Sequence, residues 1–277
     1  MASAEEAVFQ AEAPQEDGDK TMSEWSTVGS EQAGAGLWHQ ISMITPWVFA
    51  GLLLFFALRA VLRQRRYRAM GTLDEDDKRI VREAIARAER KTVGEILPVV
   101  VERSDPYPGA NWLSSLFCVL IGSALAAAWL PWNRPALVLL AQLAMGGLGF
   151  TLSAMLPGFK RLFILRNHAA SVAKEQAFQE FYANGLHKTE AATGVLIFVS
   201  LLEHRVIVMA DEGINAVVDD NFWDTVNDLI LQGISKGSLR DGLVAGIDRA
   251  GDRLAEFFPW AEGDRNEIPD RLIIRRE

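Results

Sequence analysis

The sequence predicts an α/β fold in which a small mixed sheet is sandwiched by helices and split by a transmembrane helical hairpin, after one N-terminal transmembrane helix. Three observations predict this fold. Two long uncharged stretches, 112–133 and 135–159, are separated by Arg134 alone. Runs of β-branched residues on both sides of these stretches are typical of buried strands. Helical repeats of apolar residues flank those runs.

The two uncharged stretches have the length of membrane spans. A bilayer core requires roughly 20 mostly apolar residues per helix, and each stretch reaches that length. We expect a transmembrane hairpin at 112–157, with arms at 112–132 and 135–157. Small residues at four-residue spacing favour close packing of the arms on each other, with self-association of the chain through the same faces as the second use. The absence of charged residues within the arms argues against a transport pathway.

The N-terminal region has two parts. Residues 1–37 are acidic and contain few large apolar side chains, which predicts a disordered tail. An apolar stretch follows, and we expect a transmembrane helix over 38–62. The alternative is an interfacial helix, because the first half of the stretch is weakened by His39, Gln40, Thr45 and Pro46. Five of the eight tryptophans fall at the ends of the three apolar stretches, where such rings gather at membrane interfaces.

Lysine and arginine in the flanks predict the orientation in an inner (plasma) membrane. An arginine cluster at 59–68 follows the first apolar stretch, and Lys160, Arg161 and Arg166 follow the hairpin. The tail and the hairpin turn carry few basic residues. Because basic flanks stay in the cytoplasm, we expect a cytoplasmic folded domain, with the tail and the hairpin turn extracytoplasmic.

Charge and cysteine content exclude some functions. The formal net charge of −8 argues against nucleic acid as a partner, because nucleic-acid binders normally carry a basic patch. Cys118 is the single cysteine, so one chain cannot form a disulfide framework or a cysteine-based metal site.

The first part of the folded domain is expected at 72–105. The spacing of Thr72 and Glu75 is that of a capping box, which predicts a helix over 73–91. A β-branched run at 95–102 predicts the first strand. Pro98 removes one backbone donor, so we expect an edge position or a local irregularity there.

The second part of the domain is expected at 160–270. Its pattern predicts a helix, two strands joined by a tight turn, two further helices and a polar loop, at 167–184, 195–200, 205–210, 220–234, 238–257 and 261–270. A crossover of a dozen or more residues is what parallel pairing needs, so the first two strands should be parallel. The third strand should be antiparallel to the second, with helices on both faces of the sheet.

The two soluble parts together resemble the TPM-domain family, and more closely the bacterial membrane type in which a transmembrane pair splits the domain. The segments that carry the resemblance are 90–96, 193–206, 211–214, 242–243 and 258–259. The resemblance implies a mixed-sheet α/β sandwich. Some relatives are reported as acid phosphatases or bind divalent cations, and others act as accessory or assembly factors. Many relatives carry a Gly-aromatic-Gly-Leu-Glu turn where this chain has residues 210–214.

Acidic residues should gather at one edge of the sheet. Glu95 begins the first strand, and the antiparallel third strand ends at that same edge. Clustered carboxylates are the ligands that Ca²⁺ or Mg²⁺ requires. The predicted metal ligands are Glu95, Asp211, Glu212, Asp219 and Asp220. The alternative is that Asp219 and Asp220 only begin a helix and that Asp211 and Glu212 are solvated turn residues.

The expected function is a membrane-anchored, non-catalytic binding, assembly or accessory module at the inner membrane. Its partners would be the lipid bilayer and another membrane or membrane-associated protein. The alternative is a divalent-cation-dependent, phosphatase-like hydrolase that uses the acidic edge. The sequence contains no G-x-S-x-G, Walker or H-E-x-x-H motif.

Overall fold

The computed structural model describes residues 73–129 and 135–275, together with the single residues 51, 55 and 58. Contacts divide the chain into Met1–Gly51 and Leu52–Glu277, and every element below belongs to the second unit. The predicted tail lies outside the described residues. So does the predicted first span, apart from those single residues.

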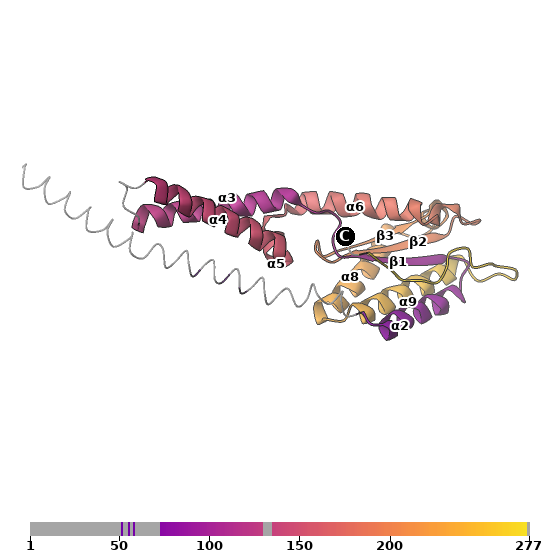
Figure 1. Cartoon of the computed structure of the whole chain (residues 1–277). Helices are drawn as coiled ribbons and strands as arrows, with labels where there is room; N and C mark the ends of the chain where they lie inside the picture. The colour runs from indigo at the N-terminus through magenta and orange to yellow at the C-terminus, as the bar shows by residue number, and fades with distance from the viewer. Residues whose placement is uncertain (1–50, 52–54, 56–57, 59–72, 130–134, 276–277) are drawn as a thin grey trace, which may run out of the picture. The chain divides into compact units, whose positions relative to one another are not determined.

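A four-stranded mixed sheet forms the centre of the domain (Figure 1). Its strands are β1 (Glu95–Val101), β2 (Gly194–Ser200), β3 (Arg205–Ala210) and β4 (Ile273–Arg275), in the order β3-β2-β1-β4. Strand β1 pairs in parallel with β2 and with β4, whereas β2 and β3 are antiparallel. The predicted parallel pair and the predicted β-hairpin are therefore both confirmed.

The helices surround this sheet and form the hairpin. In chain order they are α2 (Glu75–Glu89), α3 (Pro108–Trp129), α4 (Pro135–Met155), α5 (Pro157–Lys160), η2 (Arg161–Phe163), α6 (Arg166–Ala183), η3 (Leu186–Lys188), α7 (Glu212–Asn215), α8 (Asp220–Lys236) and α9 (Leu239–Phe257). Helices α3 and α4 follow β1 and precede β2, so the apolar hairpin lies within the first crossover, as predicted.

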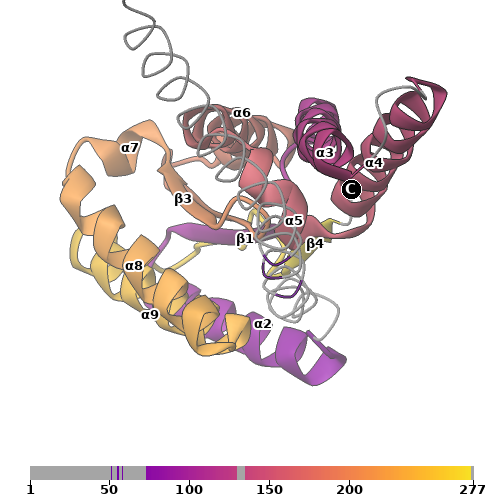
Figure 2. The ribbon, with the colours of Figure 1, turned by 90° about the vertical axis from the view of Figure 1, so that its left-hand side faces the viewer.

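Two apolar layers enclose the sheet, and Figure 2 shows helices on both of its faces. On one face, Ile85 of α2, Ile230 of α8 and Ile247 of α9 pack against β1 and β2. On the other face, Ala177 and Phe181 of α6 pack against the same two strands. Every residue of β1 and β2 is buried. Complete burial of a large apolar side chain contributes roughly 1.5–3 kcal/mol, so the two layers account for the predicted sandwich.

The two arms of the hairpin pack through small residues. The Ser114 hydroxyl donates to the Gly149 carbonyl at 2.7 Å, and the Ser115 hydroxyl donates to the Gly146 carbonyl at 2.9 Å. A Cβ atom on Gly149 would lie 2.6 Å from the Ser114 carbonyl oxygen. The small residues of α4 therefore allow the close approach of α3, which is the first use expected for them.

The hairpin helices differ in length from the prediction. Helix α3 begins at Pro108, four residues earlier than predicted, because proline is favoured in the first turn of a helix. Helix α4 ends at Met155, and Pro157 then begins the short α5. Helix α2 also differs, because its N-cap is Asp74, whose carboxylate accepts from the Asp77 N–H at 2.7 Å. The predicted capping box lies two residues earlier than this cap.

Strand β4 was not predicted, because three residues are too few for the strand pattern. Because β4 gives β1 a second neighbour, the edge position expected for the strand that contains Pro98 is wrong. Pro98 nevertheless removes no hydrogen bond between strands. The Glu95 N–H faces β2, and the Ile96 N–H faces the opposite side, where it donates to Glu89. Pro98 faces the same side as Ile96, and pairing with β4 begins only at Val99. The missing donor therefore lies where the ladder has no partner strand.

Candidate functional site

Strand pairing brings Glu95 and Asp211 to the same end of the sheet. Glu95 pairs with Gly194 at the start of β2, and the Asp211 N–H donates to the Gly194 carbonyl at 2.9 Å. One strand lies between the two acidic residues. The two residues therefore lie at the same end of the sheet, as the order of the strands predicts.

Two of the predicted ligands are helix caps. The Asp211 carboxylate accepts from the Glu212 N–H at 2.9 Å at the start of α7. The Asp219 carboxylate accepts from the Asn221 N–H at 3.0 Å at the start of α8, and its hydrogen bonds with Asn221 lower the pKa of Asp219. Glu212 and Asp220 are the first residues of the same two helices. The alternative role considered for Asp219, beginning a helix, is the one that the structure shows. Asp211, for which the alternative was a solvated turn residue, also caps a helix.

The Glu95 carboxylate binds the C-terminal segment. It accepts from the Glu267 N–H at 2.9 Å and from the Ile268 N–H at 3.3 Å. Its residue is only 5% exposed. Burial raises the pKa of Glu95, the two backbone N–H groups oppose that rise, and the charges of Glu267 and Asp264 add to it. Glu95 therefore holds the segment that leads into β4.

An acidic pocket lies beside Glu95. Its four carboxylates come from Glu89, Glu95, Asp264 and Asp270, and its volume is about 220 Å³. Asn266 Nδ2 donates to Asp270 at its rim. Helix α2 supplies Glu89, strand β1 supplies Glu95, and the segment after α9 supplies the other two carboxylates. Arg90 lines the pocket as well, so residues far apart in sequence form one cavity in which carboxyl groups outnumber the basic group.

Glu89 has the most perturbed carboxyl group of the acidic pocket. Burial raises its pKa to about 9, and the neighbouring carboxylates Asp270 and Glu95 add to the shift. The Ile96 N–H donates to Glu89 Oε1 at 2.9 Å and partly opposes the rise. At neutral pH the Glu89 carboxyl group is therefore protonated and donates to Asp270. A buried, protonated carboxyl group of this kind is able to release a proton when a cation enters the pocket.

The predicted cation site does not follow from this geometry. Within the part of the chain that the structure describes, no three His, Cys, Asp or Glu side chains are arranged to hold a metal ion. Backbone N–H groups already bind both oxygens of Glu95, and Asp211 and Asp219 serve as caps. The five-residue cation site stays a prediction. Sequence reasoning missed Glu89 and Asp270, which join Glu95 only through the fold.

A second polar cluster, the hairpin junction, holds the base of the hairpin. It comprises Ser104, Tyr107, Lys160, Ser200 and Glu203. The buried Glu203 carboxylate accepts from the Ser104 N–H at 2.9 Å, from the Tyr107 hydroxyl at 2.7 Å and from the Ser200 hydroxyl. The turn between β2 and β3 is thereby bonded to the segment that enters α3.

Lys160 completes the hairpin junction from the other arm. It ends α5, is 7% exposed, and its ammonium group donates to the Pro106 carbonyl. Burial lowers the pKa of Lys160, and the charge of Arg103 lowers it further. Because Pro106 enters the hairpin and Lys160 leaves it, both ends of the hairpin are fixed to each other and to the domain.

Residues 162–253 match the family model of the TPM domain. The match begins just after the hairpin and contains α6, α7 and α8, the strands β2 and β3, and most of α9, but not α2 or β1. No curated protein matches the chain significantly. A similar solved structure is the NMR structure of BA42 protein from the psychrophilic bacterium Bizionia argentinensis sp. nov. It is 23% identical, with a TM-score of 0.47, and the match covers 74% of this chain and 96% of that chain.

Proposed function

Because this chain carries a TPM domain, we propose that it is a membrane-anchored binding module at the inner membrane, held there by the apolar hairpin. The observation that carries this proposal is the exposure of α3 and α4. Both helices have the length and composition of membrane spans. Only 33% and 17% of their apolar windows are buried inside the protein. A core helix of a soluble protein would be mostly buried.

The exposed side chains of the hairpin are large and apolar. They are Trp112, Leu113, Leu116, Phe117, Leu120, Leu137, Leu139, Leu140, Leu143, Leu148, Phe150 and Met155. Soluble proteins rarely expose contiguous apolar patches larger than a few hundred Å². A bilayer supplies the apolar surroundings that these side chains need. The basic residues at 59–68 and after the hairpin favour a cytoplasmic domain, with the hairpin turn on the other side.

Charged substitutions in α4 test the anchoring. Leu139 and Leu143 are 66% and 75% exposed, so arginine at both positions should be tolerated in water and disfavoured in a bilayer. An arginine at a helix centre costs about 2.5–3.5 kcal/mol of insertion free energy. Leu143 lies close to the centre of α4, and Leu139 lies one turn nearer its start, where the cost is smaller. Protease treatment of membranes should leave the hairpin of the natural chain protected and digest it in the Leu139→Arg/Leu143→Arg variant.

Val217→Arg is the matched control, because Val217 is a 45% exposed apolar residue of the folded domain. It should leave the hairpin protected. Digestion of the hairpin in the natural chain would overturn the proposed anchoring.

The second part of the proposal is the binding role, and it concerns the acidic end of the domain. Glu95, Asp211 and Asp219 hold backbone N–H groups, so their first task is structural. The domain end that contains the acidic pocket is then available as a negatively charged docking surface for another membrane or membrane-associated protein. Cross-linking of the full chain in membranes, with Glu262→Gln and Asp264→Asn as charge-removing variants, tests this role. A partner whose cross-linking does not change with either variant would contradict the docking surface.

The second candidate function is a hydrolase that uses the acidic pocket, and the raised pKa of Glu89 favours it. Strongly perturbed carboxyl groups gather at catalytic sites, and a carboxyl group protonated at neutral pH is able to act as a general acid. A divalent cation such as Ca²⁺ or Mg²⁺ would be bound by the acidic pocket or by the five predicted ligands.

Two measurements on the detergent-solubilised full chain separate these functions. Calorimetric titration with Ca²⁺ and Mg²⁺ tests cation binding, and absence of heat at millimolar metal would remove it. Hydrolysis of a generic phosphomonoester tests catalysis. Loss of activity in Glu89→Gln but not in Asp211→Asn would place the reaction in the acidic pocket. Absence of hydrolysis with either cation favours the binding module.

A further inference from the structure

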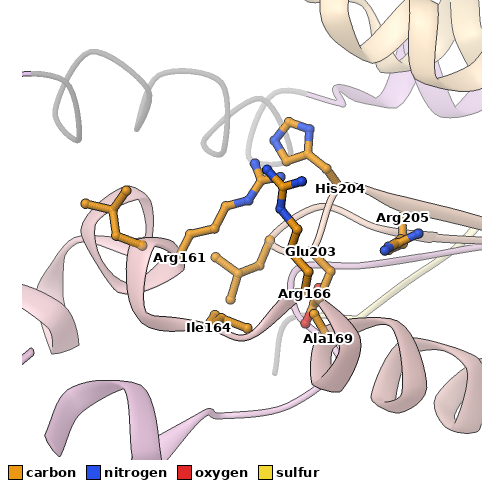
Figure 3. Close-up of a pocket in the computed structure, with 9 residues that line it drawn as sticks. Arg161, Ile164, Arg166, Ala169, Glu203, His204 and Arg205 are labelled. Carbon is orange, nitrogen blue, oxygen red and sulfur yellow. The ribbon is translucent and has the colours of Figure 1, made fainter. Parts of the chain in front are cut away.

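A basic pocket lies at the base of the hairpin, at the end of the sheet opposite to the acidic pocket. It is formed by η2, the start of α6 and the turn between β2 and β3, and its volume is about 450 Å³. Arg161, Arg166, His204 and Arg205 line it. Figure 3 shows the guanidinium groups of Arg161 and Arg166 directed toward the same side of the pocket as the His204 ring.

The lining of this pocket carries more positive than negative charge. Among the described residues that line the pocket, Glu203 is the acidic one. Its carboxylate is buried in the hairpin junction, where it accepts from Ser104, Tyr107 and Ser200. The guanidinium groups of Arg161 and Arg166 lie together, and Arg205 lines the pocket beside them, so an anion would be favoured there. Guanidinium groups bind phosphate oxygens through paired hydrogen bonds.

The basic pocket is fixed to the hairpin. The ring of Phe163 in η2 lies 5.7 Å from the Phe117 ring of α3 and 5.3 Å from the Phe159 ring of α5. Leu162 and Leu165, on either side of Phe163, are 49% and 72% exposed. Guanidinium groups and exposed leucines thus stand together where the hairpin meets the domain.

We propose that the basic pocket binds the phosphate of an anionic phospholipid headgroup. This inference rests on the proposed membrane anchoring, which places the base of the hairpin at the bilayer surface. The arginines recognise the phosphate, and the exposed Leu162 and Leu165 contact the acyl region beside it. A soluble phosphate compound would use the arginines alone and would leave the two leucines without an apolar partner.

Lipid titration of the purified full chain tests the proposal. The delipidated protein in detergent is titrated with phosphatidylglycerol or with phosphatidylcholine, and bound lipid is counted by native mass spectrometry. The natural chain should prefer phosphatidylglycerol. Each arginine near an anionic membrane surface contributes a several-fold gain in affinity. The Arg161→Gln/Arg166→Gln variant should therefore lose at least about tenfold in affinity for phosphatidylglycerol.

A charge-matched control is Arg87→Gln/Lys91→Gln, which removes two exposed positive charges from the region of α2. It should keep the preference for phosphatidylglycerol. The single variant Arg166→Gln changes one exposed residue and should show a smaller loss in the same direction. Equal binding of both lipids by the natural chain, or an unchanged preference in the double variant, would overturn the proposal.

A soluble competitor separates the two sources of phosphate. Glycerol phosphate at millimolar concentration should not displace phosphatidylglycerol from the natural chain. Complete displacement would assign the pocket to a soluble phosphate compound and overturn the lipid headgroup. Failure of the membrane anchoring would be recognised in a separate experiment. Protease would then digest the hairpin in the natural chain and in the Arg161→Gln/Arg166→Gln variant alike.

Discussion

Glu89 shows how a single buried carboxyl group couples the acidic pocket to pH. Its pKa is raised to about 9 in the folded chain by burial and by two neighbouring carboxylates. The stabilising contribution of a group with a raised folded pKa is complete below its unfolded pKa and is lost as pH rises through the folded pKa. For Glu89 that window runs from the ordinary glutamate value of 4.5 to about 9.

Replacement of Glu89 by glutamine should remove the loss of stability that the natural chain shows as pH rises. The amide reproduces the neutral form, because its oxygen accepts from Ile96 and its NH₂ group donates to Asp270. The natural chain should lose stability between about pH 5 and pH 8, and the variant should not. Over this range the unfolding free energy of Glu89→Gln, measured relative to that of the natural chain, should therefore rise by roughly 2–4 kcal/mol. Denaturant unfolding in detergent at the two pH values measures the gain.

Glu75→Gln on the same helix is the control. Its hydrogen bond with Lys78 lowers the pKa of Glu75, so this variant should not gain stability as pH rises. Parallel pH profiles for Glu89→Gln and the natural chain would show that Glu89 is not protonated at neutral pH.

Tyr107 contributes to the stability of the hairpin junction. Its hydroxyl donates to the buried Glu203 carboxylate at 2.7 Å, and burial followed by this hydrogen bond raises the pKa of Tyr107. Loss of one donor to a buried carboxylate costs about 1–3 kcal/mol. Tyr107→Phe should lower the unfolding free energy by this amount, whereas Tyr182→Phe, at a 47% exposed position, should change it little. Equal effects of the two substitutions in thermal unfolding would contradict the role assigned to the hairpin junction.

At the scale of elements, the packing of α3 against α4 depends on Gly149. A Cβ atom there would lie 2.6 Å from the Ser114 carbonyl and 2.8 Å from Cys118. Overpacking of a close contact costs about 1–3 kcal/mol, so Gly149→Ala should weaken the hairpin by that amount. A Cβ atom on Gly147 of the same helix would meet no other atom within 4 Å, so Gly147→Ala should be neutral or slightly stabilising. Thermal unfolding in detergent should separate the two variants. If it does not, the arms are not packed as described.

The sequence predicted the elements whose apolar pattern is long and regular. The strands β1, β2 and β3, the helices around them and the hairpin all fall near their predicted ranges. Strand β4 was missed because a three-residue strand has no periodicity of its own and forms only by pairing with β1. Helix α2 begins later than predicted because Asp74 is also a strong N-cap residue, so two caps compete at neighbouring positions.

The candidate site was less predictable than the fold. Glu95 was singled out from its place at the start of a strand, and its position at one end of the sheet was reached correctly. Its neighbours Glu89 and Asp270 lie in a helix end and in a polar segment, and nothing in their local sequence marks them. Asp270 meets Glu95 because β4 pairs with β1 and draws the C-terminal segment along the sheet. Glu89 meets Glu95 because α2 leads directly into β1, where the Ile96 N–H donates to Glu89. The missed strand therefore explains why Asp270 was missed.

At the scale of the whole molecule, the two ends of the sheet differ in charge, and the hairpin leaves from the basic end. The insertion between β1 and β2 leaves the basic pocket and the hairpin junction at one end of the sheet. The acidic pocket lies at the other end, together with Glu95 and Asp211 of the predicted cation ligands. We infer a polarity in which one end faces a membrane surface and the other faces the cytoplasm. This polarity is the reason for assigning lipid contact and partner binding to opposite ends.

Cysteine accessibility tests the central claim, that the domain is split by a hairpin which crosses the membrane, most directly. The single native cysteine is removed as Cys118→Ala. One cysteine is then introduced either at Asn133, in the hairpin turn that the sequence predicts, or at Lys236, at the end of α8. A membrane-impermeant maleimide should label Asn133→Cys from outside intact cells and should label Lys236→Cys only after permeabilisation. Labelling of both positions from the same side of the membrane would contradict the account.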